Sequence, residues 1–248
     1  PTRFKPGGFE FSHIVGNIDV SKAVTDKLGI AFGMEARTEA YTINAGDEAS
    51  YIGEGSNSFP GINKLNEGVN KRFNVGAYFD VSYDITKDFL INGTVRTENY
   101  SDFGSRNVWK VASRYKLADD KLVLRGSVST GFRAPTLHQT FAQSVQASFA
   151  GGTIQLSGLF NNRSAQARAL GIPNLKPELS TNISFGFGFN PTKNLSVTVD
   201  YYNIRITDRI VYSSSINTND KRLAVPTTDL GRILKGSSVG KDNFDLAS

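Results

Sequence analysis

The sequence has no cysteine, one methionine, one tryptophan and two histidines among its 248 residues. Without cysteine no disulfide can form, which fits a fold stabilised by strand pairing and fixes no cellular compartment. The sequence also lacks any run that approaches the about 18–20 consecutive apolar residues of a membrane-spanning helix. The first residues, starting at Pro1, show no basic stretch followed by an apolar one, so no secretory signal is visible there.

Charged and reactive residues are spread thinly along the chain. The 28 basic and 23 acidic residues give a net charge of +5, and they do not gather into one basic stripe. Nucleic-acid binding is therefore not expected. The two histidines, His13 and His138, lie far apart in the sequence, and no nucleophile has an obvious base beside it. We expect neither an enzyme nor a bound metal or other cofactor.

The chain consists mainly of long segments in which apolar and polar residues alternate, as they do in β-strands. We expect eight strands, at residues 9–24, 28–44, 72–85, 89–100, 106–117, 121–133, 179–190 and 194–213. The turns at 25–27, 86–88, 118–120 and 191–193 are short, whereas the connections at 46–71 and 134–177 are long, and 214–248 reads as a further loop. Short turns facing the periplasm and long loops facing outside are typical of an outer-membrane β-barrel.

The alternation also predicts which way each strand faces. In segment 28–44 one face is apolar from Leu28 to Ala36, and the other carries Glu35, Arg37 and Glu39. A basic residue facing lipid near the membrane midplane costs about 2–4 kcal/mol. The apolar face must therefore point outward, and the charged face must line the lumen.

The same test assigns most of the other strands, with polar residues inward in each case. Outward positions include Val75, Phe79, Val95, Leu124, Val128, Phe132, Ile183, Phe185, Phe187 and Phe189. The last segment changes phase, so we expect a bulge near Tyr201 and Tyr202; the phase of the first segment stays open. Glycines within strands are interpreted as points of close approach by neighbouring structure; they are Gly93, Gly126, Gly186 and Gly188.

Aromatic residues gather near both ends of the predicted strands. Those beside the short turns are Tyr83, Phe89, Tyr115 and Phe189, and those toward the loops are Tyr41, Phe73, Tyr100, Trp109 and Phe132. Because amphipathic rings collect at membrane interfaces, we expect two aromatic belts. The sequence thus predicts an all-β fold, an antiparallel transmembrane β-barrel with short periplasmic turns and long extracellular loops.

Three motifs are similar to the barrel of TonB-dependent outer-membrane receptors, a family that imports chelated iron, cobalamin and some sugars. They are NYSDFG at 99–104, LRGSVSTGFRAP at 124–135 and NLKPELS at 174–180. The resemblance also includes VDYYNI at 199–204, and it covers residues 72–211 well. It implies that residues 1–248 are about eight consecutive strands of a larger, roughly 22-stranded barrel with a plugged lumen.

The resemblance further implies a location in the outer membrane of a Gram-negative cell, in contact with outer-membrane lipid. In the family, a plug domain and the TonB energy complex drive import of a small-molecule nutrient complex. No plug domain and no energy-coupling box is visible in these residues, which puts transport by this chain alone in doubt.

Candidate lumen or ligand-binding residues are the charged inward positions and the polar start of the longest loop. They are Glu35, Arg37, Glu39, Asp80, Arg96, Glu98, Lys110, Arg114, Arg125, Arg133, His138 and Gln139. Arg133 precedes Pro135 and could bind a carboxylate or phosphate of a plug or ligand, or pair with a lumen acid such as Glu98. His138 could contact a metal chelate or simply be solvated.

Two other functions stay open at this point. Eight strands can close into a small self-contained barrel that serves as an adhesin or narrow pore, and this would require pairing of the first strand with the last. A soluble carbohydrate-binding sheet would instead bury the phenylalanines at 185, 187 and 189 against protein.

Overall fold

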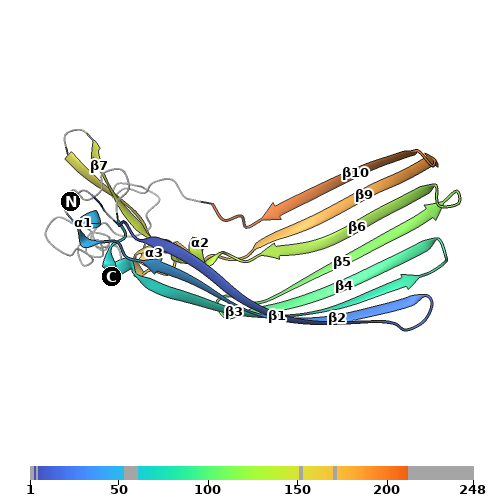
Figure 1. Ribbon diagram of the computed structural model, residues 1–248, viewed down its shortest axis with the longest axis horizontal. Coiled ribbons are helices and arrows are strands. Elements are labelled where there is room, and N and C mark those ends of the chain that lie inside the picture. The colour runs from blue at the N-terminus through green and yellow to red at the C-terminus, as the bar shows by residue number, and fades with distance from the viewer. Residues whose placement is uncertain (1–2, 4, 53–60, 151–152, 170–171, 212–248) are drawn as a thin grey trace.

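The computed structural model describes residues 3, 5–52, 61–150, 153–169 and 172–211. The predicted loop at 214–248 lies outside the described residues. Figure 1 shows a long curved sheet with short connections at one end and larger ones at the other. Within the described part of the chain, no helix is long and apolar enough to cross a membrane.

Eight antiparallel strands form the sheet and follow one another in chain order. They are β1 (Gly8–Ala23), β2 (Leu28–Asn44), β3 (Gly68–Asp84), β4 (Phe89–Tyr100), β5 (Gly104–Leu117), β6 (Leu122–Arg133), β9 (Glu178–Thr192) and β10 (Leu195–Thr207). All eight predicted strands are confirmed. The last one ends at Thr207 instead of residue 213.

The two long connections contain elements that the sequence analysis missed. The connection after β2 holds α1 (Glu48–Tyr51) and the 3-10 helix η1 (Lys64–Asn66). The connection after β6 holds α2 (Leu137–Phe141), the hairpin of β7 (Ser144–Ala150) and β8 (Thr153–Leu159), and α3 (Ala165–Ala169).

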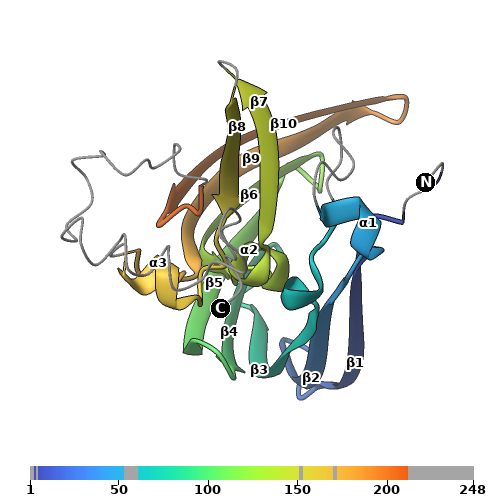
Figure 2. The ribbon, with the colours of Figure 1, turned by 90° about the vertical axis from the view of Figure 1, so that its left-hand side faces the viewer.

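The sheet is open. Strands β1 and β10 occupy its opposite edges and are not hydrogen-bonded neighbours in the described structure. Seen from the loop end, the strands form an arc that does not close (Figure 2). The alternative of a self-contained eight-stranded barrel is therefore wrong.

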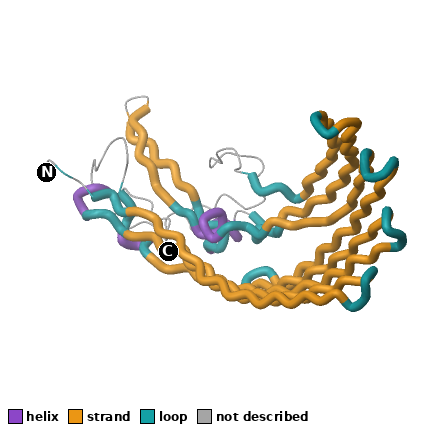
Figure 3. The backbone as a smooth tube through the Cα atoms, turned by 45° about the vertical axis from the view of Figure 1, so that its right-hand side comes forward, coloured by secondary structure: helices purple, strands orange, loops and turns teal. Residues whose placement is uncertain are grey.

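The short turns lie together at one end of the sheet, opposite the helices and the β7–β8 hairpin (Figure 3). Two of them repeat the same hydrogen bonds, in which Thr25 Oγ1 accepts from the amides of Lys27 and Leu28, and Thr86 Oγ1 accepts from those of Asp88 and Phe89. A threonine hydroxyl thus replaces a strand partner where each hairpin reverses. The predicted positions of these turns are confirmed.

The strand register confirms the predicted faces of most strands. Phe32, Phe79, Val95 and Trp109 stand side by side on the outward face of β2 to β5. The register also settles β1, whose outward residues Ile14, Ile18 and Val20 are 62–78% exposed. Phe185 is 55% exposed and Phe189 is 40% exposed. The alternative of a soluble sheet that buries these phenylalanines is therefore wrong.

The apolar part of the outward face has an oblique upper border. Going toward the loops, the apolar part ends at Ile14 in β1, Ala36 in β2, Phe73 in β3, Val95 in β4, Trp109 in β5, Val128 in β6, Ile183 in β9 and Tyr201 in β10. In β5 one polar residue, Ser113, lies within this part. In the strand register the border residue of β2, Ala36, pairs with Val75 of β3. The border residue of β10, Tyr201, is connected through successive strand pairs to Tyr83 of β3, which lies closer to the short turns. A border that steps along the strands is what tilted strands crossing one flat layer produce.

The prediction for the facing of the last strand is wrong. The expected bulge at Tyr201 and Tyr202 is absent, because pairing of β9 and β10 runs without a shift from Val197 to Thr207, and the irregularity lies between Leu195 and Val197. Ile204 and Ile206 therefore share the inward face with Asp200.

The loop-side aromatic belt is only partly formed. Phe73 and Trp109 are 49% and 45% exposed on the outward face, as predicted. Tyr41 and Tyr100 are only 2% and 6% exposed, because they share the inward face with the charged residues of their strands. Phe132 packs edge-on against Tyr100, with ring centroids 6.0 Å apart. Pairing of β5 with β6 stops at Lys110–Ser129, so the strands separate below this ring.

Three inward glycines lie beneath side-chain bridges that join the two flanking strands. Gly33 of β2 stands between Asp19 of β1 and Tyr78 of β3, and the Tyr78 hydroxyl donates to Asp19 Oδ1 at 2.9 Å. A Cβ on Gly33 would lie 2.2 Å from atoms of both side chains. Gly leaves the space through which the bridge passes.

The other two bridges are ionic. Arg96 of β4 reaches across Gly76 to Glu35 at 3.6 Å, and Arg125 of β6 reaches across Gly186 to Asp200. A Cβ on Gly186 would lie 2.0 Å from Asp200 Oδ1. The predicted close approach is thus found at Gly186, where the approaching group belongs to the sheet itself. Gly93 has nothing within 4 Å of an added Cβ.

Candidate functional site

The inward face contains a cavity of about 630 Å³ at the loop end of β1 to β4. The segment that follows β6, including α2, forms its opposite side. Its lining residues are Phe9, Glu10, Phe11, Arg37, Glu39, Tyr41, Arg72, Glu98, Tyr100, Phe132, Arg133, Ala134, Thr136, Leu137 and His138. Five predicted site residues are among them: Arg37, Glu39, Glu98, Arg133 and His138.

The strand side of the cavity carries a continuous network of charges. Arg37 Nη2 donates to Glu35 Oε1 at 2.8 Å, and Arg37 Nη1 lies 3.6 Å from Glu39 Oε1. Arg96 Nη2 lies 3.6 Å from Glu35 Oε2, and Arg96 Nε donates to Glu98 Oε1 at 2.6 Å. Acidic and basic groups therefore alternate across β2 and β4, and five predicted residues belong to one network.

Glu98 also accepts two neutral hydrogen bonds. The Tyr100 hydroxyl donates to Glu98 Oε2 at 2.8 Å, and Asn74 Nδ2 donates to the same oxygen at 3.2 Å. Glu98 is 8% exposed and Asn74 is 1% exposed. A buried carboxylate with this many donors is stabilised in its ionised form and fixed in position.

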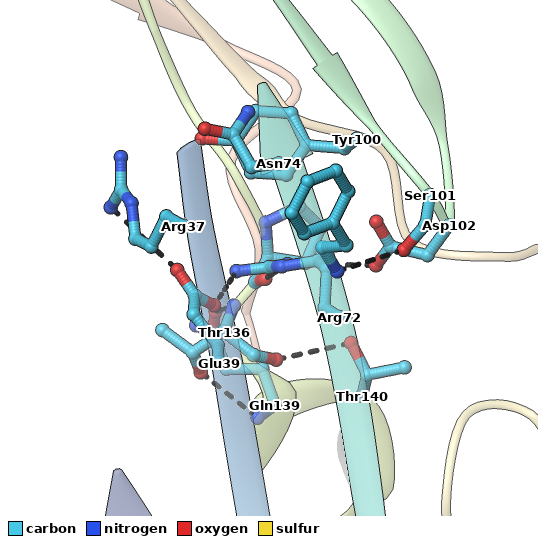
Figure 4. Close-up of polar contacts among 12 residues, drawn as sticks. Arg37, Glu39, Arg72, Asn74, Tyr100, Ser101, Asp102, Thr136, Gln139 and Thr140 are labelled. Atoms are coloured by element: carbon cyan, nitrogen blue, oxygen red, sulfur yellow. Dashed lines mark hydrogen bonds and ion pairs between the residues drawn. The ribbon is translucent and has the colours of Figure 1, made fainter. Parts of the chain in front are cut away.

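Arg72 of β3 joins this network to the loops (Figure 4). Its side chain is 4% exposed and pairs with Glu39 through Nη2. Its Nη1 donates to the carbonyl oxygen of Pro135 at 2.6 Å and lies 3.5 Å from Asp102 Oδ2. The guanidinium carbon also lies 5.1 Å from the centre of the Tyr100 ring. One buried cation thus contacts strand, turn and long loop.

The three motifs meet around this point. The end of β4 supplies Tyr100 and the turn after it supplies Asp102, whereas the end of β6 supplies Phe132 and the segment after it supplies Pro135. Motif 174–180 joins through an ion pair in which Arg133 Nε and Nη2 donate to Glu178 at 2.9 and 2.6 Å. Arg133 is therefore paired with an acid, as one of the two interpretations required, but the acid is Glu178 of β9 and not Glu98.

Helix α2 closes the cavity on the loop side. Thr136 and Gln139 form a capping box, in which Thr136 Oγ1 accepts from the Gln139 amide and Gln139 Oε1 accepts from the Thr136 amide, both at 3.0 Å. The side chain of Gln139 is thereby committed to the helix start. The His138 ring packs edge-on against Tyr41 and Phe9, at centroid distances of 5.6 and 6.2 Å.

The remaining predicted residues lie on the inward face outside the cavity. Asp80 accepts hydrogen bonds from Asn92 and Thr94. Arg125 forms a two-bond pair with Asp200, at 2.9 and 2.6 Å. Lys110 and Arg114 of β5 have no acidic partner among the described residues.

Sequence reasoning missed Arg72, Asp102 and Glu178. Arg72 was readable, because it continues the inward alternation of Asn74 at the start of its strand. Asp102 and Glu178 belong to the recognised motifs. Nothing in the spacing of the motifs indicates that Arg72 would bind Asp102 or that Arg133 would bind Glu178.

The cavity suits binding more than chemistry. Its charged lining comprises three arginines and three glutamates, so the formal charges cancel. The aromatic rings of Phe9, Phe11 and Tyr41 lie beside these groups. Among the described residues no group of three His, Cys, Asp or Glu side chains could hold a metal ion.

Comparisons with known proteins identify the fold. A family model described as TonB dependent receptor-like, beta-barrel, matches residues 7–235. The siderophore receptor PirA from Acinetobacter baumannii superimposes with a TM-score of 0.56 and 18% identity, over 81% of this chain and 27% of that one. A mutant of the ferric enterobactin receptor PfeA from Pseudomonas aeruginosa gives a TM-score of 0.58 and 14% identity, over 80% and 27% of the two chains.

A curated relative agrees with these structures. The vitamin B12 transporter BtuB of Photobacterium profundum is 31% identical over 71 residues, which are 29% of this chain and 11% of the relative. The chain therefore spans about a quarter of the solved receptors and a smaller share of this relative. Because the family model covers most of the sequence, the chain belongs to the TonB-dependent receptor-like β-barrel family.

Proposed function

We propose that these residues are part of the barrel of an outer-membrane TonB-dependent transporter that binds and imports a small nutrient complex. The cargo is an iron–siderophore, cobalamin or carbohydrate-like molecule. The remaining strands, the plug domain and the contact with the TonB complex belong to a longer polypeptide. The open sheet and the quarter-length match to solved receptors support this division.

The observation that carries the proposal is the division of the sheet into two faces. Large apolar side chains stay exposed on the outward face, as contact with lipid requires. The inward face concentrates ion pairs and a cavity on the side of the long loops. We assign the cavity as part of the outer binding site for the nutrient.

Uptake measurements test the proposal. The full-length receptor is produced in a Gram-negative strain without its own receptors, with and without tonB. Labelled ferric siderophores, cobalamin and oligosaccharides are then supplied one at a time. We expect accumulation of one of these cargoes only when tonB is present. Equal accumulation without tonB, or accumulation of none of the three classes, contradicts the proposal.

Variants of the cavity test the assigned site. Arg37→Gln together with Phe11→Ala changes one charged and one aromatic lining residue, and we expect the half-saturating cargo concentration to rise at least fivefold. The matched control is Lys71→Gln, an exposed outward residue next to Arg72. Unchanged uptake in the cavity variant would exclude this cavity from cargo binding.

A further inference from the structure

A second polar surface lies on the inward face of β5, β6 and β9. It consists of Lys110, Arg114, Ser127, Ser129, Asn182 and Ser184, here called the β5–β9 patch. None of these residues lines the cavity. We infer that the β5–β9 patch binds a small multivalent oxyanion, a molecule that carries carboxylate or phosphate groups.

The first argument is uncompensated charge. The inward arginines of β2, β3, β4 and β6 are all ion-paired. Lys110 and Arg114 are exposed and have no such partner in the described part of the chain. The nearest acid in the row of Lys110 is Asp80, two strands away, or about 10 Å. Its carboxylate already accepts from Asn92 and Thr94.

The second argument is the arrangement of donors. Lys110 and Arg114 are four residues apart on one face, which separates their Cα atoms by about 13–14 Å. The residue between them on that face is Ala112, whose side chain is small. Ala112 pairs with Ser127, whose Oγ lies 2.8 Å from Ser184 Oγ. Two cations on one strand and serine hydroxyls on the neighbouring strands form a donor set suited to oxyanions.

The third argument is a conflict between like charges. Arg114 stands directly opposite Arg125 in the pairing of β5 and β6. Like charges in this position destabilise a sheet. Arg125 is drawn across Gly186 to Asp200, which compensates its charge and leaves Arg114 uncompensated. A bound anion would compensate the second cation.

The inference goes beyond the proposed uptake function and can fail without it, because the patch and the cavity are separate. The test uses the purified full-length receptor in detergent at low salt. Radiolabelled citrate and, in a separate arm, pyrophosphate are measured by equilibrium dialysis. We expect saturable binding of at least one, and the arm that binds identifies carboxylate or phosphate as the preferred group.

Variants place the binding on the patch. Lys110→Gln with Arg114→Gln should weaken binding at least tenfold, whereas Lys110→Arg with Arg114→Lys should stay within about threefold. Lys116→Gln is the matched control, since Lys116 lies on the same strand and is paired with Asp120. Resistance of each variant to SDS without heating verifies that the barrel is folded.

Three outcomes overturn the inference. The first is that the wild-type receptor binds neither anion, and the second is that the Gln variant binds as tightly as the wild type. The third is that the trimethyl ester of citrate binds as tightly as citrate. If an acidic segment of the receptor covers the patch, the wild type binds neither anion, and the thermal midpoint of the Gln variant falls. That result also rejects a small-molecule site.

Discussion

At the scale of single residues, Arg72 does most to define the site. It is buried on β3 and contacts Glu39, Asp102, the Pro135 carbonyl and the Tyr100 ring. Breaking a buried ion pair from one side leaves the other charge in a poorly solvated place, which is strongly destabilising. One side chain therefore holds the turn after β4 and the loop after β6 against the sheet.

Replacing Arg72 by leucine should lower the stability of the full-length receptor by about 3–5 kcal/mol, because Glu39 loses its closest partner. Arg72→Lys keeps the charge but not the forked geometry, and we expect an intermediate loss. Denaturant unfolding in detergent measures both. Lys71→Leu, at the exposed neighbouring position, is the control. Equal midpoints for Arg72→Leu and the control would show that Arg72 does not hold these segments together.

The bridged glycines give a second prediction at this scale. In Gly186→Ala the new methyl group would lie 2.0 Å from Asp200 Oδ1 and 2.9 Å from the Val199 carbonyl oxygen. We expect a loss of about 1–3 kcal/mol from overpacking. Gly93→Ala has free space around its Cβ and should change stability little. The same unfolding experiment compares the two, and an equal effect of both variants would refute the steric argument.

At the scale of elements, the alternation of the strands was the most reliable signal. It assigned Glu35, Arg37 and Glu39 to the lumen because one misplaced charge in lipid outweighs many weaker preferences. The same alternation places Tyr41 and Tyr100 inward, and the expectation of an aromatic belt wrongly overruled it. The alternation also assigned Phe132 to the outward face, and this was wrong: its ring lines the cavity and packs against Tyr100, because β5 and β6 have separated at this point.

The connection between β6 and β9 shows what local patterns leave out. The β7–β8 hairpin has alternating apolar residues around a Gly-Gly pair, a recognised hairpin signature. Its strands were therefore readable. The ion pair of Arg133 with Glu178 could not be predicted from the sequence, because its partners are 45 residues apart. It forms only because β9, after the whole insertion, returns to pair with β6.

Arginine substitutions on the outward face test the lipid contact of the strands. Phe79→Arg, in the middle of the apolar row of β3, should cost about 2–4 kcal/mol and reduce the amount of assembled receptor. Thr42→Arg also lies on the outward face but beyond the apolar border of β2, opposite Glu10 of β1, and we expect nearly normal assembly. Heat-modifiable mobility in membrane fractions reports the assembled form. If both variants assemble equally, the apolar border does not mark the lipid layer.

At the scale of the whole molecule, the free edges of β1 and β10 determine how stable the sheet is on its own. Every backbone group left unpaired in hydrocarbon costs several kcal/mol, and these edges lie at opposite ends of the sheet. Family resemblance predicted this openness, whereas strand count alone was compatible with a closed barrel. The cavity could be predicted only in part, since its far side comes from a helix in the long loop.

Residues 1–248 expressed alone should therefore not give a heat-resistant monomer in detergent micelles. We expect aggregates or oligomers joined through the edges of β1 and β10. Semi-native electrophoresis with light scattering distinguishes these species, and the full-length receptor serves as the folded control. A monodisperse, heat-resistant monomer of the short chain would show that the edges are satisfied without further strands.

The side-chain bridges over Gly33, Gly76 and Gly186 also determine alignment. If β2 slid by two residues between its neighbours, Ala31 or Glu35 would come beneath the contact of Asp19 with Tyr78, and its Cβ would collide with that contact. Each bridge can therefore form in only one register of the strands. A strand that carries such a bridge can pair with the edge of the assembling sheet in a single offset. This preserves the tilt of the strands as the barrel forms.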